Sequence, residues 1–284
     1  VARSVDGGKT FEWLTVAGYE KRDFRDIEAF DANTAIIMGI AEPAVILKTK
    51  DGGKNWYKVF EDTTKGMFLD AMDFDEKGNG FVIGDPVAGN LFEAFTVDNG
   101  DHWTSLNMPD PAKKLADGEA FFASSGSNIV VTGNIDYPTI YATGGTVSRL
   151  FYKEKIYPLN IIQGKESTGA NSVAIDPSGK NAVIVGGDFS ADTFAVLNCV
   201  LIKLKNKPEV KHPKTPPHGY RSCVEYITKN KLITCGTSGV DISTDGGMNW
   251  QLISKQSFHV CQKAKKGNAV FLAGGNGKIA RLEY

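Results

Sequence analysis

Two arginines stand at matching places in the sequence and could bind an anion. Arg25 follows Phe24 in the segment FRDI, and Arg221 follows Tyr220 in YRSC, so each is the second residue of a strand-like segment. A guanidinium group carries a planar fork of donors that fits a carboxylate or a phosphate through two parallel hydrogen bonds. If the fold brings these segments together, the two arginines suit a carboxylate or phosphate ligand.

Two aspartates suggest a different chemistry. Asp85 follows the apolar run FVIG, and Asp188 follows VIVGG. Glycosidases use two carboxyl groups, about 5–10 Å apart, as acid and as base or nucleophile. The sequence therefore keeps glycoside hydrolysis by Asp85 and Asp188 as an alternative to binding alone.

Other chemistries find little support. The histidines show no metal-ligand spacing, and the cysteines show no CxxC pair, so we expect no metal site. GGTVSR and GGNGK are glycine-rich but fit neither a dinucleotide fingerprint nor a P-loop, so we interpret them as turns and expect no cofactor. The four cysteines lie in apolar segments and are expected to be buried thiols, with a Cys223–Cys235 bridge across a hairpin as the alternative.

Four segments share the pattern hydroxyl, any residue, Asp, any residue, Gly, any two residues, aromatic. They read SVDGGKTF, TKDGGKNW, TVDNGDHW and STDGGMNW. The carboxylate can accept N–H groups inside a tight turn, the glycine permits positive φ, and the aromatic ring returns to pack on the sheet. We therefore interpret the four aspartates as structural: Asp6, Asp51, Asp98 and Asp245.

The spacing of these turns predicts a repeat. The intervals between the four aspartates are 45, 47 and 147 residues, and the last equals three intervals of 49. Short apolar strands ending in glycine recur with a similar spacing, at Gly39, Gly84, Gly133, Gly186, Gly236 and Gly274. Each follows one strand-like segment and precedes another, and the Asp-Gly turn leads to a fourth. Four antiparallel strands per repeat are typical of a β-propeller blade.

We expect one all-β propeller domain over residues 1–284. Third strands number seven when VARS at the start is included, which favours a seven-bladed propeller of four-stranded antiparallel blades with the first blade incomplete at the N-terminus. A six-bladed propeller is the alternative. The sequence opens at Val1 with no initiator Met and no visible signal peptide, so we expect a processed or truncated chain.

These turns and glycine-ended strands resemble the BNR/Asp-box repeat superfamily, and within it the photosystem II stability/assembly factor-like propellers. The resemblance implies that the box aspartates lie away from the usual site, which surrounds the mouth of the central channel. Its members include glycosidases, sorting receptors and assembly factors, so the likeness predicts the fold more than the function.

First-strand starts and the loops between second and third strands should surround this mouth. EAFFAS is expected as the first strand of the third blade, and the longer loops are IAEPA, DPVAGN, NIDYPT and GDFSADTF. The residues predicted to bind a ligand there are Arg25, Asp26, Asp70, Asp85, Glu119, Asp136, Asn171, Asp188, Arg221 and His259.

Sialidases within the superfamily need three arginines on the substrate carboxylate and a Phe/Tyr-Arg-Ile-Pro motif. Here FRDI lacks the proline, and only Arg25 and Arg221 fall at first-strand starts. The sequence therefore departs from that pattern, and we expect no catalytic residue of this kind.

The composition argues against two classes of partner, nucleic acids and a membrane that the chain would span. A net charge of −1 argues against a nucleic-acid ligand, because no basic excess exists to neutralise phosphates. The lysines at 203, 205, 207, 211 and 214 are interpreted as a solvated hairpin edge. No apolar run is long enough for a membrane span. We expect a monomeric, non-catalytic binding or assembly protein, exported to the periplasm or the extracellular space, whose channel mouth binds a protein or glycan.

Overall fold

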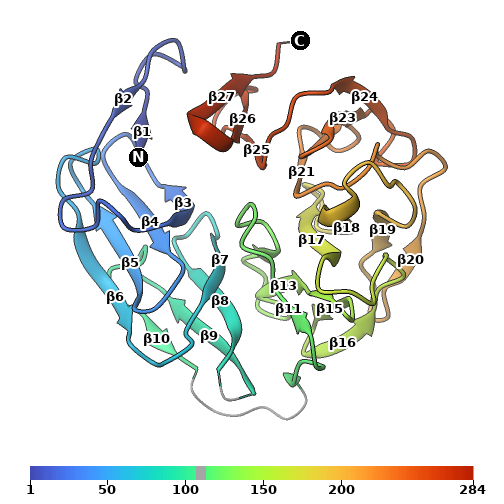
Figure 1. Ribbon diagram of the computed structural model, residues 1–284, viewed down its shortest axis with the longest axis horizontal. Coiled ribbons are helices and arrows are strands. Elements are labelled where there is room, and N and C mark those ends of the chain that lie inside the picture. Colours follow the sequence, from blue (N-terminus) through green and yellow to red (C-terminus); the bar gives the residue numbers. More distant parts are fainter. Residues whose placement is uncertain (88, 107–112, 284) are drawn as a thin grey trace. The chain divides into compact units, whose positions relative to one another are not determined.

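The computed structural model describes residues 1–87, 89–106 and 113–283 (Figure 1). The chain divides into two compact units, Val1–Leu115 and Ala116–Tyr284. In the described residues, the regular structure consists of antiparallel strands and two short 3₁₀ turns, η2 (Phe189–Ala191) and η3 (Gly275–Gly277). None of the helices in these ranges has the length and apolarity to cross a membrane. The fold is an all-β propeller type with four-stranded antiparallel sheets, as predicted.

The first unit contains, within its described part, a two-stranded sheet followed by two four-stranded sheets. The two-stranded sheet consists of β1 (Ala2–Arg3) and β2 (Glu12–Trp13). The next consists of β3 (Phe24–Ala29), β4 (Ala35–Gly39), β5 (Ala44–Thr49) and β6 (Tyr57–Asp62). The last consists of β7 (Leu69–Phe74), β8 (Gly80–Val87), β9 (Asn90–Thr96) and β10 (Thr104–Ser105).

The second unit contains four sheets in the residues described there. The first consists of β12 (Ile129–Val131), β13 (Thr139–Ala142), β15 (Arg149–Tyr152) and β16 (Lys155–Pro158). The second has the strand order β11 (Glu119–Ala120), β14 (Gly144–Gly145), β17 (Thr168–Ile175), β18 (Asn181–Asp188), β19 (Cys199–Lys203) and β20 (Glu209–Lys211). The third consists of β21 (Cys223–Tyr226), β22 (Leu232–Gly236), β23 (Gly239–Ser243) and β24 (Gln251–Ser254). The fourth consists of β25 (Val260–Lys263), β26 (Val270–Gly274) and β27 (Lys278–Arg281).

The number of blades corrects the preferred prediction. Six sheets in the described ranges have at least three strands, which matches the six-bladed alternative rather than seven blades. The surplus third strand at the N-terminus is β1, whose one partner among the described strands is β2, through Ala2–Trp13 and Arg3–Glu12. A pair of two-residue strands buries too little apolar surface to form a blade by itself.

The segment EAFFAS does not form the first strand of the third blade, contrary to the expectation. Its first two residues form β11, which pairs with β14 at Gly144–Gly145, whereas the blade begins at β12. The loop NIDYPT consequently joins β12 to β13, the first strand to the second. The apolar alternation of this segment did not reveal the shift, because polar partners of Glu119 hold the segment outside the sheet that begins at β12.

Neighbouring sheets in the second unit bury their apolar faces against each other. One cluster joins β12–β16 to β17–β20 through residues such as Ile140, Leu150 and Ile184. Another joins β21–β24 to β25–β27 through residues such as Ile233 and Leu272. A buried aliphatic side chain of this kind contributes about 1.5–3 kcal/mol. Within the second unit, these sheets are therefore stabilised by the next sheet along the chain, as expected for a repeat of sheets with two apolar faces.

The Asp-box turns have the structural role predicted for them. In the second box, Asp51 Oδ1 accepts from Thr49 Oγ1 and from the Asn55 N–H, both at 2.9 Å, and Oδ2 accepts from Asn55 Nδ2 at 2.7 Å. These hydrogen bonds, led by the Asn55 N–H, lower the pKa of Asp51 to about 2. The same hydroxyl–Asp pairing recurs at Asp6, Asp98 and Asp245.

The four cysteines are free thiols and buried, as the preferred interpretation predicted. Cys223 and Cys235 face each other across β21 and β22 as register partners. Cys223 also approaches Cys261 on the next sheet, where its Sγ donates to the Cys261 carbonyl at 3.3 Å. Cys223, Cys235 and Cys261 therefore fill the apolar layer between these two sheets, whereas Cys199 packs with Val183 and Trp250.

Candidate functional site

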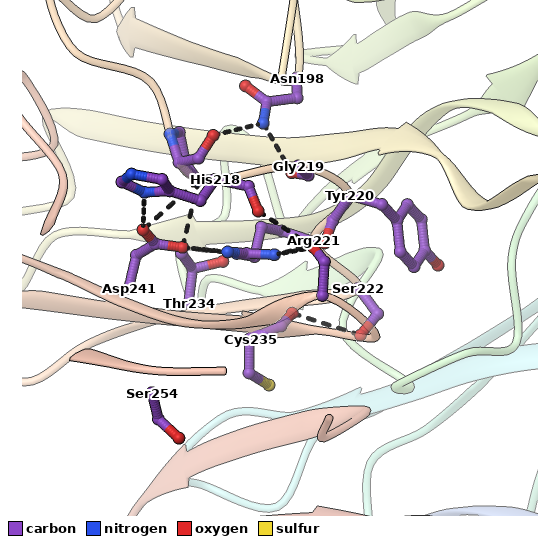
Figure 2. A network of polar contacts seen from close by, with 12 residues as sticks. Asn198, His218, Gly219, Tyr220, Arg221, Ser222, Thr234, Cys235, Asp241 and Ser254 are labelled. Atoms are coloured by element: carbon purple, nitrogen blue, oxygen red, sulfur yellow. Dashed lines mark hydrogen bonds and ion pairs between the residues drawn. The ribbon is translucent and has the colours of Figure 1, made fainter. Parts of the chain in front are cut away.

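Arg221 is buried and bonded within the protein. Its Nε donates to Asp241 Oδ2 at 2.7 Å, and Nη2 donates to the same oxygen (Figure 2). Nη1 donates to the Tyr220 carbonyl at 2.8 Å and to Ser238 Oγ at 2.7 Å. Both charged side chains have no exposed surface. In this arrangement, the guanidinium predicted to bind a ligand anchors the segment that precedes β21.

We call residues 217–222 the strap. Its residue His218 contacts Asp241 through Nδ1, 2.6 Å from Oδ1, while the imidazole remains half-exposed. From the other side, Asn198 Nδ2 donates to the carbonyls of Pro217 at 2.9 Å and Gly219 at 2.6 Å (Figure 2). These bonds fix the strap between β23 and the start of β19.

Gly219 brings the strap against the loop that joins β18 to β19. Its φ is +90°, and a Cβ at this position would lie 2.1 Å from the Asp192 carbonyl oxygen. The next N–H, that of Tyr220, donates to that same oxygen at 2.8 Å. Glycine satisfies both the left-handed conformation and the close approach.

Residues 189–197, which we call the apolar loop, present large apolar side chains to solvent. Phe189, Phe194, Val196 and Leu197 are 49%, 46%, 55% and 40% exposed. The main chain beneath them is well bonded, because Phe194 N–H donates to the Ala191 carbonyl and the Leu197 carbonyl accepts from the Ile162 N–H, both at 2.8 Å. Leu197 has a φ of +54°, which is uncommon for a leucine.

Aromatic rings support the start of the apolar loop. Phe189 packs edge-on against Phe122 and Tyr220, with centroid separations of 6.1 and 6.3 Å. The Tyr220 hydroxyl donates to Asn171 Oδ1 at 2.8 Å, and Ser124 Oγ donates to the same oxygen at 3.2 Å. Burial raises the pKa of Tyr220 to about 12. Asn171, predicted as a ligand contact, is buried and accepts both of these hydrogen bonds.

Asp188 and Glu119 also make bonds within the chain. Asp188 Oδ1 caps the 3₁₀ turn η2 by accepting from the Ser190 N–H at 2.9 Å. Glu119 is buried, with Arg149 donating to both carboxylate oxygens at 2.6 and 2.7 Å and the Thr143 hydroxyl donating to one of them. The structure thus places Glu119 in an ion pair between β11 and β15.

The remaining predicted residues of the second unit lie apart from this network. Asp136 is exposed in the β12–β13 loop, where its N–H donates to Asn134 Oδ1. His259 precedes β25, and its carbonyl accepts from Ser222 Oγ at 2.6 Å. Ser125 Oγ in turn donates to the Ser222 carbonyl at 2.7 Å. Ser125 and Ser222, which the sequence reasoning missed, therefore connect segments that lie far apart in the chain.

In the first unit, the predicted residues occupy β3, β7 and β8. Arg25 is exposed and pairs with Asp23 at 2.9 Å. Asp26 Oδ2 accepts from the Met72 N–H at 2.8 Å, joining β3 to β7, and burial raises the pKa of this carboxyl well above its usual range. Asp70 is buried in β7, and Asp85 is partly buried in β8.

The second unit thus places a polar hydrogen-bond network beside an exposed apolar loop. Among the described residues, no group of three or more His, Cys, Asp or Glu side chains could hold a metal ion. The strap and the apolar loop instead combine a rigid polar base with exposed aromatic and aliphatic side chains. Charge-poor aromatic clusters of this kind are typical of the centre of protein interfaces.

Comparison with known proteins identifies the repeat. A family model described as "BNR/Asp-box repeat" matches residues 241–252, from β23 through the fourth box to β24. This chain carries a BNR/Asp-box repeat. The predicted likeness to Asp-box propellers is therefore confirmed in both motif and fold. None of the curated proteins matches the sequence.

Solved structures share the fold at low identity. The GH74 enzyme of Niastella koreensis is 13% identical with a TM-score of 0.61, over 91% of this chain and 44% of that one. The GH74 xyloglucanase of Xanthomonas campestris is 14% identical with a TM-score of 0.56, over 94% and 46%. This Asp-box chain thus spans less than half the length of either enzyme. YCF48 bound to a D1 peptide is 16% identical with a TM-score of 0.48, over 94% and 95%.

The apolar loop was not among the residues that sequence reasoning selected. That reasoning favoured charged residues at strand ends, and it chose Asp188 from the segment GDFSADTF. The signal was present in the next residues, because FSADTFAVL places four large apolar side chains in a long loop, where polar residues are usual.

Proposed function

We propose that this protein is a non-catalytic binding protein that holds an apolar segment of another protein on its apolar loop. The observation that carries the proposal is the exposure of Phe189, Phe194, Val196 and Leu197 on a loop that the strap fixes in place. Exposed apolar patches of this kind mark interaction sites, and a prefixed backbone lowers the entropic cost of binding.

A protein partner suits this surface better than a glycan. The loop offers two phenylalanines with valine and leucine beside them, and Asp192 is its one charged residue. Sugars need many hydrogen-bond partners around an aromatic platform, whereas apolar side chains of a peptide need mainly a dry surface. The predicted polar residues nearest the loop, Asn171, Asp188 and Arg221, are bonded to their own chain.

A random peptide library panned on the whole protein tests the proposal. We expect the selected peptides to be rich in aromatic and aliphatic residues and to bind Phe194→Asp at least about tenfold more weakly, a loss of about 1.4 kcal/mol. Ile135→Asp is the matched control, because Ile135 is 95% exposed in another loop of the same unit. Equal weakening by the two variants would contradict the proposal.

Hydrolysis is checked on the same protein. A panel of chromogenic glycosides should give no turnover above that of heat-denatured protein. Turnover that falls in Asp85→Asn and Asp188→Asn would replace this proposal with glycoside hydrolysis.

A further inference from the structure

The two units carry opposite net charge. Residues 1–115 hold 13 lysines and arginines against 20 aspartates and glutamates, whereas residues 116–284 hold 19 against 13. The whole-chain charge of −1 therefore hides a first unit of −7 and a second of +6. A basic surface on the second unit raises the local concentration of acidic partners.

A groove in the second unit gathers part of this positive charge. It measures about 260 Å³ and lies between the sheet of β17–β20 and the sheet of β21–β24, at the end where the fourth Asp-box supplies Gly246. Lys203 and Lys211 line one wall, and Lys229 in the β21–β22 turn lines the other. Leu201 and Tyr226 add an apolar floor.

The acidic residues that line the groove already have partners within the chain. Asp176 accepts from Ser178, from the Lys180 N–H and from Asn181, all within the β17–β18 turn. Glu209 pairs with Lys205 at 2.6 Å, and its pKa is lowered by that contact first and by the charges of Lys203 and Lys211 after it.

The three groove lysines are available to a ligand. Lys203, Lys211 and Lys229 are exposed, and the structure gives their ammonium groups no hydrogen bond or ion pair in the ranges it describes. Glu209, the register partner of Lys203, offsets part of their charge, and the groove lining keeps three lysines against the two acids Asp176 and Glu209.

The spacing of two lysines suits an extended peptide. Leu201 pairs with Lys211 and Lys203 with Glu209, so Lys203 and Lys211 are diagonal neighbours on one face. Such neighbours lie about 7–8 Å apart. Alternate side chains of an extended strand lie about 7 Å apart, twice the rise of about 3.3 Å per residue.

We propose that this groove binds an extended acidic peptide segment, whose alternate carboxylates pair with Lys203 and Lys211 while Lys229 closes the opposite side. The site is separate from the apolar loop and does not depend on the function proposed for it. The acidic segment can belong to the protein that binds the apolar loop or to another protein. The groove recognises the spacing of its carboxylates and offers an apolar surface to the rest of the segment.

Fluorescence anisotropy on the whole protein tests this site with a labelled Glu-Ala-Glu-Ala-Glu-Ala peptide. We expect binding that weakens with salt and that falls at least about tenfold in the triple variant K203Q/K211Q/K229Q. The control K155Q/K255Q/K266Q removes the same charge from exposed lysines outside the groove and should change the affinity about twofold or less. Phe194→Asp should leave this binding unchanged.

Two further peptides test whether the groove recognises the spacing and the charge of the carboxylates. A peptide with its three glutamates adjacent should bind more weakly than the alternating one, and the peptide with Gln in place of Glu should not bind. Equal losses in the two triple variants would assign the binding to net charge and overturn the proposal. Saturable binding of inorganic phosphate without binding of the alternating peptide would overturn it as well.

Discussion

Arg221 and Asp241 place two opposite charges where neither side chain has exposed surface. Removing such ions from water costs several kcal/mol each, and the cost is offset only where the remaining donors and acceptors have partners. Here Tyr220 and Ser238 accept from Nη1, and His218 contacts the second oxygen of Asp241. The pair therefore holds the strap in one conformation because any other would leave a buried charge without a partner.

Breaking this pair from one side should destabilise the protein strongly. We expect Arg221→Met to lower the free energy of unfolding by about 3–5 kcal/mol, because Asp241 stays buried without its guanidinium. The double variant R221M/D241L should lose clearly less than the sum of the single losses. Urea unfolding of the four proteins measures this coupling.

His218→Ala is the control for that cycle, since its half-exposed ring contributes less and should cost about 1 kcal/mol. Additive losses for Arg221→Met and Asp241→Leu would show that the two charges do not act as a pair.

At the residue scale, the sequence predicted positions better than contacts. Arg221 was predicted as the second residue of a first strand and lies two residues before β21, which begins at Cys223. Its partner was hidden, because Asp241 lies in the apolar third strand VDIST and nothing in the spacing shows which strand faces it. A single charged residue in an apolar strand is the one available sign of such a partner, since a buried carboxylate needs a cation or several hydrogen-bond donors nearby.

At the element scale, the turns were the elements whose structure the sequence predicted best. The Asp-box works locally, with donor and acceptor within four residues, so its geometry follows from the motif itself. Asp75 and Asp176 form comparable turns between first and second strands, with Asn79 and Asn181 as their partners. These were missed because their spacing differs from the box and they lack its aromatic residue.

Gly219 tests how the strap positions the apolar loop. Gly219→Ala meets both a positive φ and the Asp192 carbonyl oxygen, so the strap must move away from the loop. We expect a loss in stability larger than the ~1–2 kcal/mol of the left-handed conformation alone, together with weaker binding of the apolar peptides. Urea unfolding and peptide affinity measure the two effects.

Gly246→Ala is the matched control, because Gly246 has a φ of +77° and no atom within 4 Å of a Cβ. It should show the conformational cost without the loss of peptide binding. Equal behaviour of the two variants would mean that the contact with Asp192 does not position the apolar loop.

At the scale of the whole molecule, the period of the Asp-boxes predicted the repeating sheet but left the number of blades open. Intervals of 45, 47 and three times 49 residues fix how many strands a repeat can hold. They do not show whether the strands at an end pair into a blade, and β1–β2 remains a two-stranded sheet. Pairing between distant segments depends on side chains that no local pattern encodes.

The predicted single domain over residues 1–284 can be tested against the two compact units with probes that the sequence supplies. All four cysteines lie in the second unit, and three of the four tryptophans, Trp13, Trp56 and Trp103, lie in the first. In Trp250→Phe, fluorescence reports the first unit alone and thiol labelling the second alone. Because the 49-residue interval continues across residue 115, we expect one cooperative transition in urea, with the same midpoint by both probes. Both are read on one variant, so any loss of stability from the substitution affects them together, and separate midpoints would show that the units unfold as two domains.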